Sequence, residues 1–166
     1  MAAVRGKART EGDGSASAST GTQGKEQQEV PRKQSVILLD TQAAVWLVTR
    51  PQQLSRRAAA AIRRAEAGDG LAIASVTLME LALLLADGKI RPRGTPRGWL
   101  LDFVAQTGVA TRDITVDIAA VAAHLPPPFP PDPFDRLIAA TAIVERMRLV
   151  TADVRIRESG VVGTIW

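Results

Sequence analysis

Short apolar runs alternate with longer helical patterns along residues 35–166. The runs that predict β-strands are 36–39, 71–74, 109–111, 149–151 and a closing segment at 163–166. The patterns that predict helices are 41–49, 55–67, 77–86, 95–106, 115–124, 134–147 and 154–158. A strand as continuously apolar as 36–39 is typical of a parallel sheet covered on both faces. The alternation therefore predicts an α/β fold with a mostly parallel sheet.

Residues 1–34 have a different composition. They contain no Leu, Ile, Phe or Trp and are rich in Gly, Ser and Thr. Such a segment cannot bury enough apolar surface to offset the entropy of ordering it. It has neither the apolar run of a signal peptide nor the acid-poor composition of a transit peptide. We predict a disordered N-terminal tail before a domain at 35–166, and a start codon assigned too far upstream would give the same pattern.

Composition narrows the chemistry. The chain has no cysteine and a single histidine, His124, so thiolate sites and multi-histidine metal sites are excluded and any metal must be held by oxygen ligands. The net charge of +4 over 166 residues does not by itself indicate a nucleic-acid-binding protein. No stretch approaches the length of a membrane span, so we expect a soluble protein of the reducing cytoplasm.

Four aspartates fall at the predicted ends of strands or at the start of a predicted helix. Asp40 directly follows the first strand and Asp153 follows the fourth, while Asp132 and Asp135 flank the start of a predicted helix. In parallel α/β sheets the carboxyl ends of strands meet at one edge, where ligand sites form. Each aspartate taken singly is more simply interpreted as a helix N-cap.

Glu80 is harder to explain as a structural residue. It lies in an apolar helix that should be buried, and no Lys or Arg occurs between Arg64 and Lys89. A buried, unpaired carboxylate costs several kcal/mol, so it must protonate, pair with a distant arginine or meet a cation.

Asp40, Glu80, Asp135 and Asp153 come from separate segments that could converge at one sheet edge. Clustered carboxylates raise one another's pKa values unless a cation neutralises them. Oxygen ligands favour Mg²⁺ or Mn²⁺, and such a site suits hydrolysis of a phosphodiester.

Five motifs carry a resemblance to a known family. They are VILLDTQAAVWL from 36, IASVTLMELALLLADGKI from 73, DPFDRLIAATAI from 132, LVTADVRI from 149 and VGTIW from 162. In order and spacing, residues 36–166 resemble a PIN-domain ribonuclease, and more closely a VapC-type toxin of a toxin–antitoxin pair. The resemblance implies a three-layer α/β/α sandwich and an Mg²⁺- or Mn²⁺-dependent endoribonuclease that cleaves RNA of the tRNA or rRNA class. It also implies an antitoxin partner and a homodimer.

The resemblance also implies roles for single residues. Asp40 and Asp135 are expected to be the metal ligands, and Glu80 and Asp153 to complete the site directly or through water. The expected mechanism is metal-assisted hydrolysis, with Glu80 or Asp153 steering or deprotonating the attacking water. Asp132 is an auxiliary candidate that also suits helix capping. Relatives commonly carry His where this chain has Gln42.

Other candidates are auxiliary. Thr41 and Thr151 are expected to orient the neighbouring aspartates or to cap helices, and Arg136 to meet a phosphate or neutralise the carboxylates. The residues that could follow an RNA backbone, or simply lie on a solvated loop, are Arg91, Arg93 and Arg97. The aromatic residues interpreted as core or dimer surface are Trp46, Trp99 and Phe103.

Three other functions compete with this interpretation. A non-catalytic PIN-like module that binds RNA or protein would use the carboxylates as caps and ion pairs. A receiver-like domain is disfavoured because the only lysine beyond residue 34 is Lys89, in a predicted loop. A dinucleotide-binding fold is disfavoured because LDTQAA, not a glycine-rich turn, follows the first strand.

Overall fold

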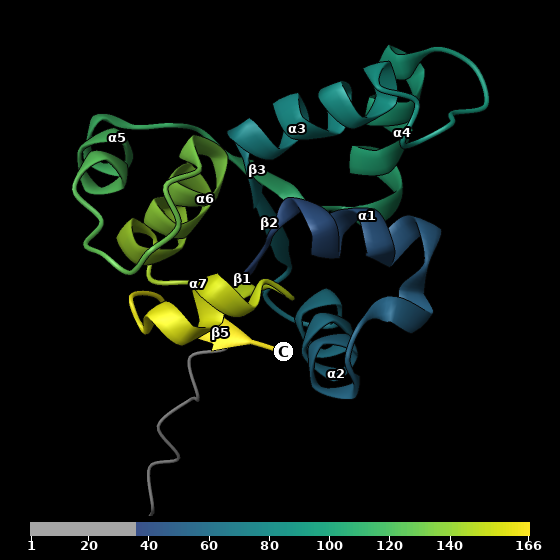
Figure 1. Cartoon of the computed structure of the whole chain (residues 1–166). Coiled ribbons are helices and arrows are strands. Elements are labelled where there is room, and N and C mark those ends of the chain that lie inside the picture. Colours follow the sequence, from purple (N-terminus) through teal and green to yellow (C-terminus); the bar gives the residue numbers. More distant parts are fainter. Residues whose placement is uncertain (1–35) are drawn as a thin grey trace, which may run out of the picture. The chain divides into compact units, whose positions relative to one another are not determined.

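A parallel sheet forms the centre of the computed structural model, which describes residues 36–166; the predicted tail at 1–34 lies outside the described residues. Within this range the strand order is β3-β2-β1-β4-β5, and all four strand pairs are parallel (Figure 1). The strands are β1 (Ile37–Leu39), β2 (Leu71–Ala74), β3 (Ala110–Arg112), β4 (Arg148–Val150) and β5 (Thr164–Ile165). The predicted parallel sheet is confirmed.

Helices cover both faces of the sheet, as expected for a three-layer α/β/α sandwich (Figure 1). One face carries α1 (Thr41–Thr49), α2 (Arg56–Glu66), α3 (Ser75–Ala86) and α4 (Pro96–Thr107). The other carries α5 (Val116–Ala123), α6 (Pro133–Val144) and α7 (Val154–Ser159). A short 3-10 helix, η1 (Pro51–Gln53), that the sequence did not predict follows α1.

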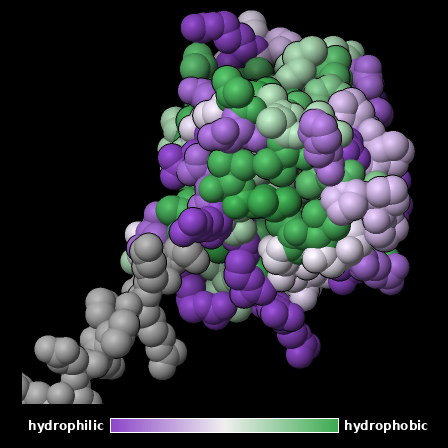
Figure 2. Space-filling view, turned by 90° about the vertical axis from the view of Figure 1, so that its left-hand side faces the viewer, coloured by the Kyte–Doolittle hydropathy of each residue, from purple (hydrophilic) through white to green (hydrophobic). Residues whose placement is uncertain are grey.

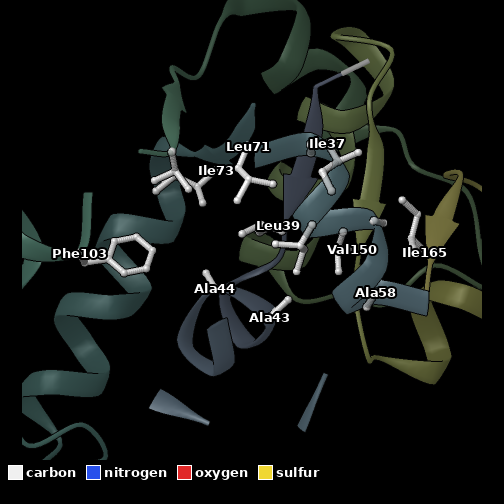
Figure 3. Close-up of a cluster of buried hydrophobic side chains, with 14 of the residues drawn as sticks. Ile37, Leu39, Ala43, Ala44, Ala58, Leu71, Ile73, Phe103, Val150 and Ile165 are labelled. Carbon is white, nitrogen blue, oxygen red and sulfur yellow. The ribbon is translucent and has the colours of Figure 1, made fainter. Parts of the chain in front are cut away.

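The central strand β1 divides the core in two. Because successive side chains of a strand point to opposite faces, Ile37 and Leu39 join the cluster under α1–α4, while Leu38 joins the cluster under α5–α7. Figure 3 shows the first cluster, where Ala43 and Ala44 of α1 lie against the strands. Both alanines are fully buried, and α1 begins at the end of β1 because Asp40 alone separates the two elements.

Two helices differ from prediction. The expected burial of α3 on all sides is wrong, because the helix lies in an outer layer: Leu81 is fully buried, but Met79 and Leu83 are 54% and 42% exposed. Helix α6 ends at Val144, three residues early. The chain leaves it through Arg146 with φ 55°, and the Met147 amide donates to the Ala142 carbonyl at 2.8 Å. This is a Schellman end without its usual glycine, so the sequence held no stop signal.

The surface carries exposed apolar side chains. The face that bears α5 presents a hydrophobic patch (Figure 2). Val116, the first residue of α5, is 86% exposed, and Ile114, two residues before it, is 47% exposed. No helix among residues 36–166 has the length and apolar character needed to cross a membrane.

Candidate active site

The candidate site lies where the strand order reverses. The chain runs from β1 to β2 on one side of the sheet and later returns to β4 on the other, so the carboxyl ends of β1 and β4 flank a switch point. A cavity of about 520 Å³ opens at this edge. We call it the acidic cavity, because the carboxylates that line it are Asp40, Glu80, Asp132, Asp135 and Asp153. The five predicted acids therefore share one cavity.

Asp40 is the most buried of these acids, at 8% exposure. It is the N-cap of α1: its Oδ1 accepts from the Ala43 amide, and its own amide donates to the Val150 carbonyl at 3.1 Å. Burial raises the pKa of Asp40 to about 6, and hydrogen bonds from Thr151 and Ala43 oppose the rise. The charges of Asp135 and Glu80 raise this pKa further.

Asp135 lies in the first turn of α6, with 26% of its side chain exposed. Burial raises the pKa of Asp135 to about 6, the charges of Asp132 and Asp153 add to the rise, and Arg155 opposes it. Asp132 caps the same helix by accepting from the amides of Phe134 and Asp135 at 2.9 and 3.1 Å. The cap interpretation of Asp132 is confirmed, while Asp135 is not a cap.

Glu80 reaches the cavity from α3. Its Oε2 accepts a hydrogen bond from the Thr41 hydroxyl, which lies 3.4 Å from the hydroxyl of fully buried Thr77. Burial raises the pKa of Glu80, although the Thr41 hydrogen bond opposes the rise. Within residues 36–166 no lysine or arginine forms an ion pair with Glu80, so the distant arginine considered above is not found there.

Asp153 is held by an arginine that the sequence analysis missed. Its Oδ1 caps α7 by accepting from the Arg155 amide, and its Oδ2 accepts from the Arg155 guanidinium, each at 2.7 Å. The guanidinium also lies 3.8 Å from Asp135. The hydrogen bond from the Arg155 side chain lowers the pKa of Asp153. The signal was present, because an arginine two residues after a capping aspartate can fold back onto it.

The structure also places the auxiliary candidates. Thr151 hydrogen-bonds Asp40 and accepts from the Asp153 amide at 3.0 Å, so it links the two acids. Both expectations for Arg136 are wrong: its guanidinium points to the end of α5 and donates to the Ala122 and Leu125 carbonyls at 2.8 and 3.0 Å. Those carbonyls lack helical partners, which explains the preference.

The three arginines expected to follow an RNA backbone differ in how close they lie to the acidic cavity. All three are exposed on the segment after α3 or at the start of α4. Arg91 lines a hollow next to the acidic cavity, whereas Arg93 and Arg97 line neither of these two depressions.

The donor set fits a hard divalent cation. Within residues 36–166 the side chains do not form a ready-made cluster of three or more ligands. Mg²⁺ does not need one, because it keeps several waters and commonly uses one or two carboxylates. Asp40 and Asp135 have pKa values raised by burial, and an added cation would relieve that cost. The carboxylates of Glu80 and Asp153 already have partners in Thr41 and Arg155.

Comparison with known proteins agrees with this architecture. The sequence profile of the PIN domain matches residues 37–161. Ribonuclease VapC22 of Mycobacterium tuberculosis is 42% identical over 123 residues, which span 74% of this chain and 91% of that protein. The chain therefore belongs to the PIN-domain family and to its VapC group, as the motifs suggested.

Solved structures share the fold at low sequence identity. VapBC2 from Rickettsia felis, bound to a DNA fragment from its promoter, superposes with a TM-score of 0.61 at 18% identity and covers 78% of this chain and 97% of that one. A toxin–antitoxin complex from Klebsiella pneumoniae gives 0.54 at 23% identity, covering 78% and 96%. The three-layer fold is thus shared with these solved toxin–antitoxin structures.

Proposed function

We propose that this chain is a divalent-metal-dependent endoribonuclease and the toxin of a toxin–antitoxin pair. The observation that carries the proposal is the placement of Asp40 and Asp135 in one cavity, both with pKa values raised to about 6 by burial. A purely structural set of caps and ion pairs would not need two partly buried carboxylates whose charges destabilise each other. The 42% identity to a ribonuclease supports the same activity.

Asp40 and Asp135 would hold the ion. Bound Mg²⁺ or Mn²⁺ would supply charge neutralisation at the scissile phosphate and a more acidic water. Thr151 and the Ala43 amide fix the Asp40 carboxylate in place. Thr41 fixes Oε2 of Glu80, which leaves Oε1 to take the proton of the attacking water. The raised pKa of Glu80 brings it closer to neutral pH, where a base accepts a proton more readily.

The products follow from which bond breaks. Attack by water in line with the 3′-oxygen leaves a 5′-phosphate on one fragment and a 3′-hydroxyl on the other. We expect the substrate to belong to the tRNA or rRNA class, and the shape of the surrounding loops to select among such RNAs.

Two protein partners complete the proposal. Structural relatives include a VapBC2 assembly and a toxin–antitoxin complex, so we expect a cognate antitoxin here as well. An antitoxin cation entering the acidic cavity would neutralise the carboxylates and block RNA. The exposed apolar side chains near α5, Val116 and Ile114, support a further contact with a second copy.

Cleavage of bacterial total RNA by purified protein tests the proposal. We expect new 5′-phosphate ends with Mg²⁺ or Mn²⁺ and none with EDTA. Asp40→Asn and Asp135→Asn should each abolish them, whereas the matched control Asp102→Asn, at an exposed position on α4, should cleave like the parent. Equal cleavage by Asp40→Asn and the parent, or cleavage in EDTA, would refute the metal site. No cleavage with normal RNA binding would favour a non-catalytic module.

A further inference from the structure

A second hollow adjoins the acidic cavity. It has a volume of about 470 Å³ and lies between α1, the start of α4 and the segment after α3. Four residues line both depressions: Val45, Trp46, Lys89 and Ile90. The two depressions are therefore continuous, and a chain-like ligand that leaves one enters the other.

This hollow has the opposite charge to the acidic cavity. Its charged lining residues are Arg50, Lys89 and Arg91, and no carboxylate lines it. Lys89 pairs with Asp87 at 3.2 Å, but both side chains are more than half exposed, so water screens the pair. Within residues 36–166 neither Arg50 nor Arg91 forms an ion pair. We call it the basic hollow, and its charge suits an anionic occupant.

Two tryptophans also line the basic hollow. Trp99 stacks on Phe103 with ring centroids 5.7 Å apart and 13° between planes, and Trp46 packs on Trp166 at 5.8 Å. Both tryptophans are only partly buried. Each ring is therefore supported by another aromatic ring yet still contributes surface to the hollow. This modifies the expectation that Trp46 and Trp99 serve only the core or a dimer surface.

We infer that the basic hollow binds single-stranded RNA next to the scissile phosphate, with phosphates at Arg50 and Arg91 and an unpaired base stacked on Trp46 or Trp99. The inference rests on the proposed function. Cations combined with supported aromatic rings are the means by which proteins hold single strands, since only an unpaired base exposes its ring face. In a double helix the bases are already stacked on each other and cannot reach the indoles.

The helical geometry of α1 fits this assignment. Asp40 caps its N-terminus, Trp46 lies about 9 Å further along the helix axis, and Arg50 is the C-cap at the other end. One helix thus carries a metal-ligand candidate, a stacking ring and a phosphate-binding cation in sequence. A basic peptide would be repelled by Arg50 and Arg91, which favours RNA over a basic antitoxin segment as the occupant.

Equilibrium binding without cleavage tests the basic hollow. A fluorescein-labelled, mixed-sequence single-stranded RNA 12-mer is titrated with protein in EDTA, and anisotropy is read at several salt concentrations. We expect Arg50→Ala/Arg91→Ala to raise Kd roughly tenfold at 0.1 M salt and to flatten the salt slope by about 1.4, the value for two lost phosphate contacts. The control Arg56→Ala/Arg57→Ala removes the same charge from exposed positions on α2, and it should change neither the Kd nor the salt slope.

A second pair of variants tests stacking. Trp46→Leu should weaken binding roughly five- to hundredfold, and Trp46→Phe should restore most of the affinity. Thermal unfolding checks that each variant folds. If Trp46→Leu unfolds, the arginine pair alone decides the outcome.

Three results from the variants would overturn the inference. The first is RNA binding by Arg50→Ala/Arg91→Ala equal to that of the parent, and the second is equal weakening of RNA binding by both arginine pairs. The third is that Arg50→Ala/Arg91→Ala no longer binds a co-expressed antitoxin but still binds RNA, which would make the hollow a protein-binding site. The proposed function fails separately, through cleavage that ignores Asp40→Asn or EDTA. Absence of RNA binding by the parent also refutes the basic hollow, while metal-dependent cleavage would still support the proposed function.

Discussion

Replacing Asp40 by asparagine should stabilise the metal-free protein while removing its response to Mg²⁺. Asp40 is 8% exposed and ionised at pH 8, so the fold keeps a buried charge at this position. Asparagine is as good an N-cap as aspartate and can still accept from the Ala43 amide. The substitution therefore removes the charge but preserves the cap of α1.

The raised pKa of Asp40 gives the size of the expected gain in stability. Burial raises the pKa of Asp40 from 3.8 to about 6, which corresponds to about 3 kcal/mol of stability lost when the group ionises. A raised acid pKa means that the folded state binds the proton more tightly than the unfolded state. The parent should therefore lose stability as the pH rises from about 4 through 6. At pH 8 Asp40→Asn should be more stable by up to about 3 kcal/mol, and at pH 4 the difference should vanish.

Urea unfolding of both proteins in EDTA, at pH 4, 6 and 8, measures this difference. Repeating the pH 8 series with Mg²⁺ at ten times its dissociation constant should stabilise the parent by about 1.4 kcal/mol and leave Asp40→Asn unchanged. A less stable Asp40→Asn at pH 8 would show that the buried charge has a compensating partner. An equal response of both proteins to Mg²⁺ would place the ion elsewhere.

Two further substitutions concern arginines near the site. Arg155→Ala should tighten Mn²⁺ binding about two- to fivefold in isothermal titration calorimetry, because the substitution removes an exposed guanidinium that competes with the ion for Asp153 and Asp135. Weaker Mn²⁺ binding would mean that Arg155 helps to shape the site. Arg136→Ala should lower the free energy of unfolding by about 1 to 3 kcal/mol in urea, because carbonyls at the end of α5 lose their donors, and should leave cleavage unchanged. Lost cleavage at normal stability would contradict that structural role.

The sequence predicted the parts of the fold that local signals control. The strand predicted before Asp40 and the helices predicted to begin near Ser55, Thr95 and Thr115 are confirmed, and the structure shows these three side chains as helix caps. The end of α6 was missed because Arg146 adopts the left-handed turn that glycine usually marks. The burial of α3 was overestimated because apolar composition does not tell which helix faces point to solvent.

The sequence predicted which acids lie together where the topology of the sheet alone gathers them. Asp40 and Asp153 follow strands that pair in parallel, so any parallel order that joins β1 to β4 brings them to one edge. Side-chain direction is a different matter. Arg136 follows Asp135 in sequence, yet successive residues of a helix point about 100° apart, so it faces α5 rather than the cavity. The spacing of Asp153 and Arg155 allows the arginine to fold back onto the aspartate, but only the structure shows that it does.

The sequence left open whether each aspartate caps a helix or serves the site. In this fold the two roles do not exclude each other. Asp40 and Asp153 each use Oδ1 to accept from a helix amide. A carboxylate has a second oxygen, and the cap fixes where that oxygen points. Asp132 does the same for α6 and so orients the turn that carries Asp135. At the proposed metal site, capping would supply the rigidity that a water-rich Mg²⁺ ion with few protein ligands needs, and loss of a cap should weaken metal binding as well as destabilise the helix.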